Sequence, residues 1–306
     1  MKKLWSEVEQ EFFDNLDVKV RSKNTYRHQL NVFKVWIITT GRNINSLKRS
    51  DILAYKSHLI AQGKEASTID TYLTILRLFY QFIEEYGYGE NIAADIKYKR
   101  KAKGYRKEHL TQEEVNKLLN SIDRNKIIGL RDYTMVFLML TTGLRCTEVN
   151  NLSVCDLQKE DGYNYLLVKR KGYDQKSTKF GITQHLADMI TDYLTQRGVE
   201  EDNEPMFPSR FHERMKDMSV SRHICQLMRN AGIESKKKTA HSLRHTAAVR
   251  AIEANVPIRQ VQIMLGHTDV KTTELYIGSI DAEMRLRNPV VQVLEEIALN
   301  GKETGK

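Results

Sequence analysis

Two arginines and two histidines stand in short motifs between residues 141 and 269. TTGLRCTE contains Arg145, HSLRH contains His241 and Arg244, and IMLGHTD contains His267. Guanidinium groups donate paired hydrogen bonds that match phosphate oxygens, and they stay protonated at any working pH. His241 precedes Arg244 by one helical turn, so the two side chains share a helix face. These residues predict a site that holds a phosphate, the plainer alternative being a solvated helix end.

A lysine and a tyrosine add to this set. Lys171, in VKRKGYDQK, is expected at the tip of a hairpin, and Tyr276 follows His267 by nine residues. Each has an ordinary structural explanation as well, because turns favour polar residues and helical tyrosines commonly pack in cores. His245, one residue beyond Arg244, is expected to point elsewhere and to be structural. The order of the candidates is therefore more informative than any one of them.

The composition favours a polyanionic partner and argues against a secreted or membrane protein. The formal net charge of +9 and the pI of about 9.2 suit a protein that binds nucleic acid. The length of 306 residues suggests two domains. Its three cysteines form no CxxC pair, so neither a disulfide framework nor a zinc site is expected. MKKLWSEVEQEFF lacks the apolar core of a signal peptide. We expect a cytoplasmic, nucleoid-associated protein with no membrane partner.

The first 96 residues are expected to form a helical domain. Apolar residues recur at helical spacing in two stripes, the first of Tyr26, Leu30, Phe33 and Ile37 and the second of Ile69, Leu73, Leu76, Phe79 and Ile83. Ser22 is a candidate N-cap for the first of these helices and Gly41 a candidate stop. A shorter helix is expected to begin at Ser50 and Asp51, between the helices that carry the two stripes. The stripes predict the core of a helical bundle.

A strongly basic segment, residues 97–107, follows this domain. Its sequence KYKRKAKGYRK contains seven Lys or Arg and no acid, and a bare linker would need no such charge. We expect a linker that lies along a phosphate backbone. The candidate DNA-contacting residues are those of this segment and four from the helices: Lys97, Lys99, Arg100, Lys101, Lys103, Arg106, Lys107, Lys23, Arg27, Arg77 and Arg222. Lys23, Arg27 and Arg77 fall mostly off the apolar stripes, and residues in such positions are more often solvated than functional.

The second domain, residues 108–306, is predicted to be mainly helical with a small antiparallel β-sheet. A capping box, T-x-x-E, begins at Thr111. Asp-Gly and Lys-Gly turn signals flank the strand-like YNYLLV, which predicts about three strands within residues 154–183. The chain is expected to be helical again from Leu186. The tail, residues 281–306, contains an apolar helix in PVVQVLEEIALN.

Together the candidate residues resemble the signature of the tyrosine recombinases, also called the phage integrase family. The family motifs are an arginine in T-G-L-R-x-x-E, a hairpin lysine, H-x-x-R, G-H or G-W, and a tyrosine a short distance further on. They correspond here to Arg145 with Glu148, Lys171, His241 with Arg244, His267 and Tyr276. Asn255 stands where the family usually has Gly, and Asn also tolerates a left-handed helix end before Pro257. YIG replaces the commoner Y-T-H, and neither departure removes a catalytic group.

The resemblance covers nearly the whole chain and implies its architecture and partners. Residues 1–96 resemble the family's SAM-like core-binding domain, residues 97–107 a linker, and residues 108–306 its catalytic domain. The resemblance also implies that the tail helix docks into a neighbouring protomer, although packing on its own domain is an alternative. The implied partners are double-stranded DNA, further copies of this chain in a dimer or tetramer, and accessory proteins.

The chemistry implied by the resemblance is DNA cleavage and rejoining. Tyr276 would attack the phosphodiester and form a 3′-phosphotyrosine bond, with Lys171 as general acid for the 5′-oxygen and His267 bound to the phosphate. His241 would accept a proton or bind the phosphate, and Glu148 would orient the first arginine. Because the tyrosyl ester conserves the bond energy, no ATP or other cofactor is implied. No metal is expected, since the arginines take its role.

The expected activity is site-specific DNA recombination, in integration, excision or resolution. A type IB-like topoisomerase uses similar residues to cut one strand and relax supercoils. A non-cutting architectural DNA-binding protein would need only the basic surface, and the complete residue set argues against it.

Overall fold

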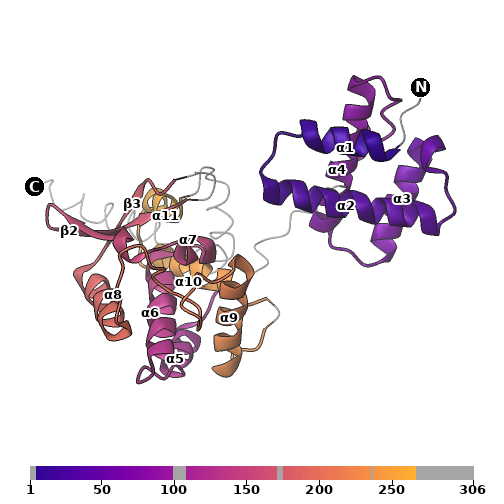
Figure 1. Cartoon of the computed structure of the whole chain (residues 1–306). Helices are drawn as coiled ribbons and strands as arrows, with labels where there is room; N and C mark the ends of the chain where they lie inside the picture. Colours follow the sequence, from indigo (N-terminus) through magenta and orange to yellow (C-terminus); the bar gives the residue numbers. More distant parts are fainter. Residues whose placement is uncertain (1–4, 99–107, 171–174, 236, 267–306) are drawn as a thin grey trace, which may run out of the picture. The chain divides into compact units, whose positions relative to one another are not determined.

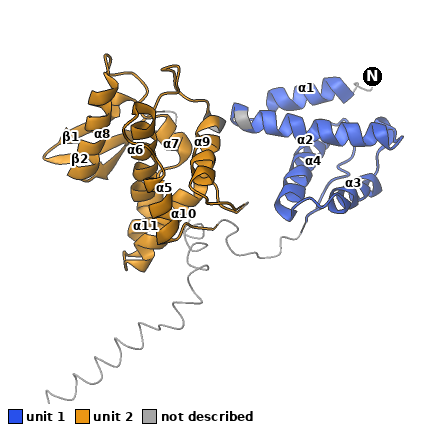
Figure 2. Cartoon of the chain, turned by 90° about the horizontal axis from the view of Figure 1, so that it is seen from below, with its two compact units in different colours: residues 1–103 blue, residues 104–306 orange. Residues whose placement is uncertain are grey.

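The structure is a computed structural model that describes residues 5–98, 108–170, 175–235 and 237–266 (Figure 1). The chain divides into two compact units, Met1–Lys103 and Gly104–Lys306 (Figure 2). Each unit has a hydrophobic core of its own, so the amino-terminal helices and the rest of the chain are stabilised separately.

Several expectations fall outside the described residues. They concern Lys171, His267, Tyr276, the tail helix and residues 99–107 of the basic segment. Within the described ranges, no helix combines the length and apolar character needed to cross a membrane.

Unit 1 is a helical bundle in its described part. Its elements are α1 (Trp5–Asn15), α2 (Val20–Thr39), the 3-10 helix η1 (Ile44–Ser46), α3 (Arg49–Ala61) and α4 (Ala66–Glu85). Every member of the two expected stripes except the half-buried Tyr26 is buried, which confirms the predicted core. Aromatic rings join the helices: Phe12 of α1 meets Phe79 of α4 edge-on at 5.2 Å, a geometry that aromatic pairs favour.

The expected N-cap of α2 is wrong. The helix begins at Val20, with Lys19 at the N-cap position. The backbone N–H of Ser22 already donates to the Lys19 carbonyl at 2.8 Å, so Ser22 lies inside the first turn. Gly41, with a φ of 67°, follows the end of the helix as predicted.

Unit 2 is mainly helical in its described part and contains a small antiparallel sheet, as predicted (Figure 1). Its helices are α5 (Gln112–Asn120), α6 (Ile127–Thr142), α7 (Cys146–Asn150), η2 (Val154–Asp156), α8 (Gln184–Arg197), α9 (Asp217–Asn230), α10 (Ala240–Glu253) and α11 (Ile258–Leu265). Its strands are β1 (Leu157–Glu160), β2 (Tyr163–Val168) and β3 (Thr178–Ile182), in the order β1-β2-β3. The apolar helix α6 packs against both α8 and α10 and thereby organises the core.

The local signals at the element ends mostly hold. Thr111 caps α5 in the predicted capping box with Glu114. Asn255 adopts a φ of 59° after α10, and Pro257 then occupies the N-cap of α11, as the sequence suggested. The described chain is mainly helical from Leu186, as predicted, with residues 198–216 forming a loop between α8 and α9. Prolines within that loop lack the N–H that a helix interior requires.

Candidate active site

Arg145 lies at the turn between α6 and α7. Gly143 ends α6 with a φ of 64°, and a Cβ there would lie 2.9 Å from the Leu265 side chain, so the position favours glycine. Arg145 is the N-cap of α7, and its backbone N–H donates to Glu148 Oε2 at 2.8 Å. Its Nη1 donates to Oε1 of the same carboxylate at 2.7 Å. Glu148 is buried, so these two hydrogen bonds fix the Arg145 guanidinium at the start of α7.

Arg244 joins three of the motifs. It lies in α10 with only 1% of its surface exposed. Its Nη1 donates to the Gly143 carbonyl at 2.7 Å, and its Nη2 donates to the Leu265 carbonyl at 2.6 Å. Gly143 stands two residues before Arg145, and Leu265 stands two residues before His267. Folding therefore brings the ends of α6 and α11 together around one guanidinium of α10.

The histidines of α10 occupy different environments. His241 is exposed in the first turn of the helix, one turn before Arg244. His245 is buried, and its ring lies edge-on to that of His109 with centroids 5.5 Å apart. Burial, with His109 and His241 nearby, lowers the pKa of His245 to about 3. His245 is therefore neutral at physiological pH, in keeping with the structural role expected for it.

Arg170, which was not among the candidates from the sequence, also belongs to this region. It follows β2 and is buried, with Nη1 3.4 Å from Glu148 Oε2 and Nη2 donating to the Met264 carbonyl at 3.0 Å. Its guanidinium lies 5.3 Å from the centre of the Phe180 ring in β3. The sequence offered no signal for it, because residue type and spacing do not distinguish this arginine from the lysines beside it in the KRK run.

The other end of the β2–β3 connection is held by an ion pair. Lys176, just before β3, is paired with Asp156 and lies 3.3 Å from Ser153 Oγ. The Asp156 side chain is 3% exposed, so it neutralises Lys176 in a partly desolvated setting. Lys171 lies between these two anchored residues in the sequence and outside the described ranges.

The candidate DNA-contacting residues within the described ranges differ in the contacts they make. Arg77 donates to the Ile96 carbonyl at 2.9 Å and to Thr74 Oγ1 at 2.8 Å, so it fastens the chain after α4 to that helix. Arg27 lies 4.8 Å from the centre of the Phe13 ring. These contacts give both arginines a role in packing. Of the remaining candidates within the described ranges, Lys97 and Arg222 are exposed and Lys23 is half-buried.

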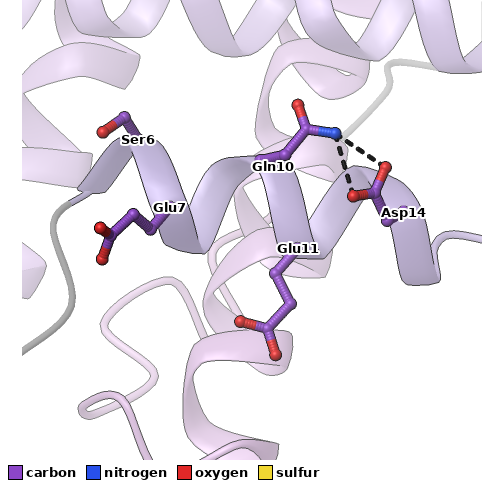
Figure 3. Close-up of a pocket in the computed structure, with 5 residues that line it drawn as sticks. All are labelled: Ser6, Glu7, Gln10, Glu11 and Asp14. Carbon is purple, nitrogen blue, oxygen red and sulfur yellow. Dashed lines mark hydrogen bonds between the residues drawn. The ribbon is translucent and has the colours of Figure 1, made fainter.

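An acidic pocket in unit 1 is unsuited to binding a phosphate. A pocket beside α1 is lined by Ser6, Glu7, Gln10, Glu11 and Asp14 (Figure 3). Its carboxylates would repel a polyanion. No group of three or more His, Cys, Asp or Glu within the described ranges could hold a metal ion.

Comparisons with known proteins place the chain in a family. The Phage integrase family matches residues 108–283, and the Phage integrase, N-terminal SAM-like domain matches residues 10–87. Tyrosine recombinase XerA of Pyrococcus furiosus is 32% identical over 278 residues, which are 90% of this chain and 90% of the relative. Tyrosine recombinase XerD of Haemophilus ducreyi is 28% identical over 286 residues, covering 90% of this chain and 94% of the relative.

A solved structure shares the fold. A lambda integrase dimer bound to a COC′ core site has a TM-score of 0.68 at 19% identity, and the match covers 89% of this chain and 93% of that one. With both domains matched in sequence and the fold matched in space, this chain belongs to the phage integrase family, the family of the tyrosine recombinases.

Proposed function

We propose that this protein carries out site-specific recombination by cutting and rejoining DNA strands through a 3′-phosphotyrosine intermediate, without metal or ATP. One observation carries the proposal most strongly: Arg244 bonds the carbonyls of Gly143 and Leu265. This arrangement brings Gly143, two residues before Arg145, and Leu265, at the end of α11, to a single guanidinium. Preorganised donors at such a site stabilise the charge that develops on a phosphate under attack.

The attack would proceed with the following residues. Tyr276 Oη forms a bond to phosphorus, the phosphorus–O5′ bond breaks, and the phenol proton passes to His241. Lys171 protonates the departing 5′-oxygen. The pairing of Lys176 with Asp156 supports this assignment, because it engages another lysine of the same connection. His267 and the two arginines bind the nonbridging oxygens, and rejoining reverses each step.

The proposed partners are double-stranded DNA and further copies of this chain, from a dimer to a tetramer, with accessory proteins as further partners. The lambda integrase match is a dimer on DNA, and another neighbour is a lambda integrase tetramer bound to a Holliday junction. We infer a core-binding domain at residues 1–96, a basic linker at residues 97–107 and a catalytic domain at residues 108–306 whose terminal helix docks into a neighbouring protomer. The chain would then work in the cytoplasm, on the nucleoid.

The proposal is tested by trapping the covalent intermediate. Cells that express the protein are lysed in denaturant, and protein that carries DNA is separated from free protein and sequenced for its DNA. We expect an adduct at a defined site for the natural chain and none for Tyr276→Phe. Exchange between two copies of the recovered site separates recombination from relaxation of supercoils alone. Absence of any adduct with intact binding would support an architectural protein instead.

A further inference from the structure

Arg170 is a buried cation beside the candidate site. Its side chain is 9% exposed, and that of its partner Glu148 is 1% exposed. Burying a charge is costly unless it is paired and hydrogen-bonded, so the position of Arg170 depends on the contacts it makes. Burial lowers the pKa of the Arg170 guanidinium, and Glu148 opposes that shift.

Through Glu148, Arg170 contacts the group that holds Arg145. The two oxygens of this carboxylate divide between the arginines: Oε1 accepts from Arg145 Nη1 at 2.7 Å, and Oε2 lies 3.4 Å from Arg170 Nη1. Oε2 also accepts the backbone N–H of Arg145 at 2.8 Å. A carboxylate shared in this way has little freedom to rotate. Its fixed orientation in turn fixes the orientation of the Arg145 guanidinium.

At its other end, Arg170 caps α11. The last carbonyls of a helix lack partners within the helix and carry its negative dipole end. Arg170 Nη2 donates to the Met264 carbonyl at 3.0 Å, and Arg244 Nη2 donates to the Leu265 carbonyl at 2.6 Å. Gly266 permits this approach, since a Cβ there would lie 3.1 Å from the Arg170 guanidinium carbon. Two guanidinium groups thus hold consecutive carbonyls at the end of α11.

We propose that Arg170 is a positioning residue that couples Arg145, through Glu148, to the C-terminal end of α11. The inference rests on the proposed function, since its effect is on DNA cleavage. Without Arg170, Glu148 loses one of its two cations and the Met264 carbonyl loses its donor. The phosphate-binding arginine then moves relative to the end of α11, and a displacement of about 1 Å in a reacting site can slow a reaction by roughly a hundredfold.

The experiment compares Arg170→Met with a matched control, Arg197→Met. Arg197 is similarly buried, donates to the Pro205 carbonyl at 2.6 Å and is paired with Glu204 at 3.1 Å. It therefore shares the chemistry of Arg170 and makes its bonds in a different part of unit 2. For each variant we would measure the melting temperature, the Kd for duplex carrying the recovered site, and the single-turnover rate of adduct formation at saturating protein.

Both variants are expected to melt at a lower temperature and to bind DNA within about threefold of the natural chain. Only Arg170→Met should form adduct more slowly once bound, by about tenfold or more. Arg170→Lys keeps the charge but reaches only one of the two partners, so it should cleave at an intermediate rate. If Arg170→Met fails to fold, Arg170→Lys carries the test, and its cleavage at the natural rate would overturn the inference.

A double variant tests the route through Glu148. If Arg170 acts by way of that carboxylate, Arg170→Met combined with Glu148→Gln should cleave no more slowly than the worse single variant. If the rate reductions of the two single variants multiply in the double variant, or if Arg197→Met slows cleavage equally, Arg170 has a structural role only. If the natural chain forms no adduct, the proposed function fails. If it cleaves and Arg170→Met cleaves equally fast once bound, only the inference about Arg170 fails.

Discussion

Replacing Arg244 with lysine should lower both stability and activity. The arginine is 1% exposed and donates to the carbonyls of Gly143 and Leu265 at 2.7 and 2.6 Å. Lysine keeps the charge but has a single nitrogen, so one of these carbonyls loses its donor. An unsatisfied buried acceptor costs about 1–3 kcal/mol. At roughly 2–4 °C per kcal/mol for a domain of this size, a cost of about 2 kcal/mol lowers the melting temperature by about 4–8 °C.

The assay follows the thermal transition of unit 2 in the full chain and, separately, adduct formation by the bound complex. Arg250→Lys is a suitable control, because Arg250 is half-buried near the end of the same helix and contacts neither carbonyl in the arrangement described. We expect Arg244→Lys to cleave about a hundredfold more slowly or worse. A melting temperature within about 1 °C of the natural chain would refute the two carbonyl contacts, since their loss must cost stability.

Three further outcomes are expected. Arg145→Lys should reduce cleavage by about a hundredfold or more with DNA affinity barely changed; collapse of binding with normal cleavage of bound DNA would make Arg145 a docking residue. Neutralising the basic residues of 97–107 should reduce the salt slope of binding by about 0.9 for each lost phosphate contact, whereas an unchanged slope would indicate a solvated linker. The pKa of His245 is lowered to about 3, below the roughly 6.5 of an unfolded histidine, so the unfolded chain binds more protons between these values. Stability should therefore fall below about pH 6.5, by about 2 kcal/mol at pH 5, and His245→Gln should flatten that part of the denaturation profile.

The elements that the sequence predicted well are those whose signals are local. The stripe from Ile69 to Ile83 has helical spacing, and its members are buried. The T-x-x-E motif at Thr111 is a capping box. Asn255 takes the left-handed conformation that the family assigns to Gly. In each case the residue type and its immediate neighbours decide the backbone conformation, so one short segment contains the necessary information.

The features that the sequence did not predict depend on contacts between distant segments. Arg170 bonds Met264, which lies 94 positions further along the chain, and nothing in KRK distinguishes the buried arginine from the lysines beside it. Lys176 is paired with Asp156, which lies 20 positions earlier in the chain, and nothing in the sequence indicated that pairing. The prediction of Ser22 as the N-cap was wrong, because capping preference does not determine which of several nearby polar residues begins the helix.

The most direct test of the account identifies the amino acid that carries the DNA. Trapped adduct would be digested with nuclease and protease, and the modified peptide would be sequenced by mass spectrometry. We expect a nucleotide attached through phosphate to Tyr276, in the peptide that contains TTELYIG. Attachment to any other residue, such as Tyr173, would contradict the assignment of the nucleophile and with it the arrangement of the site.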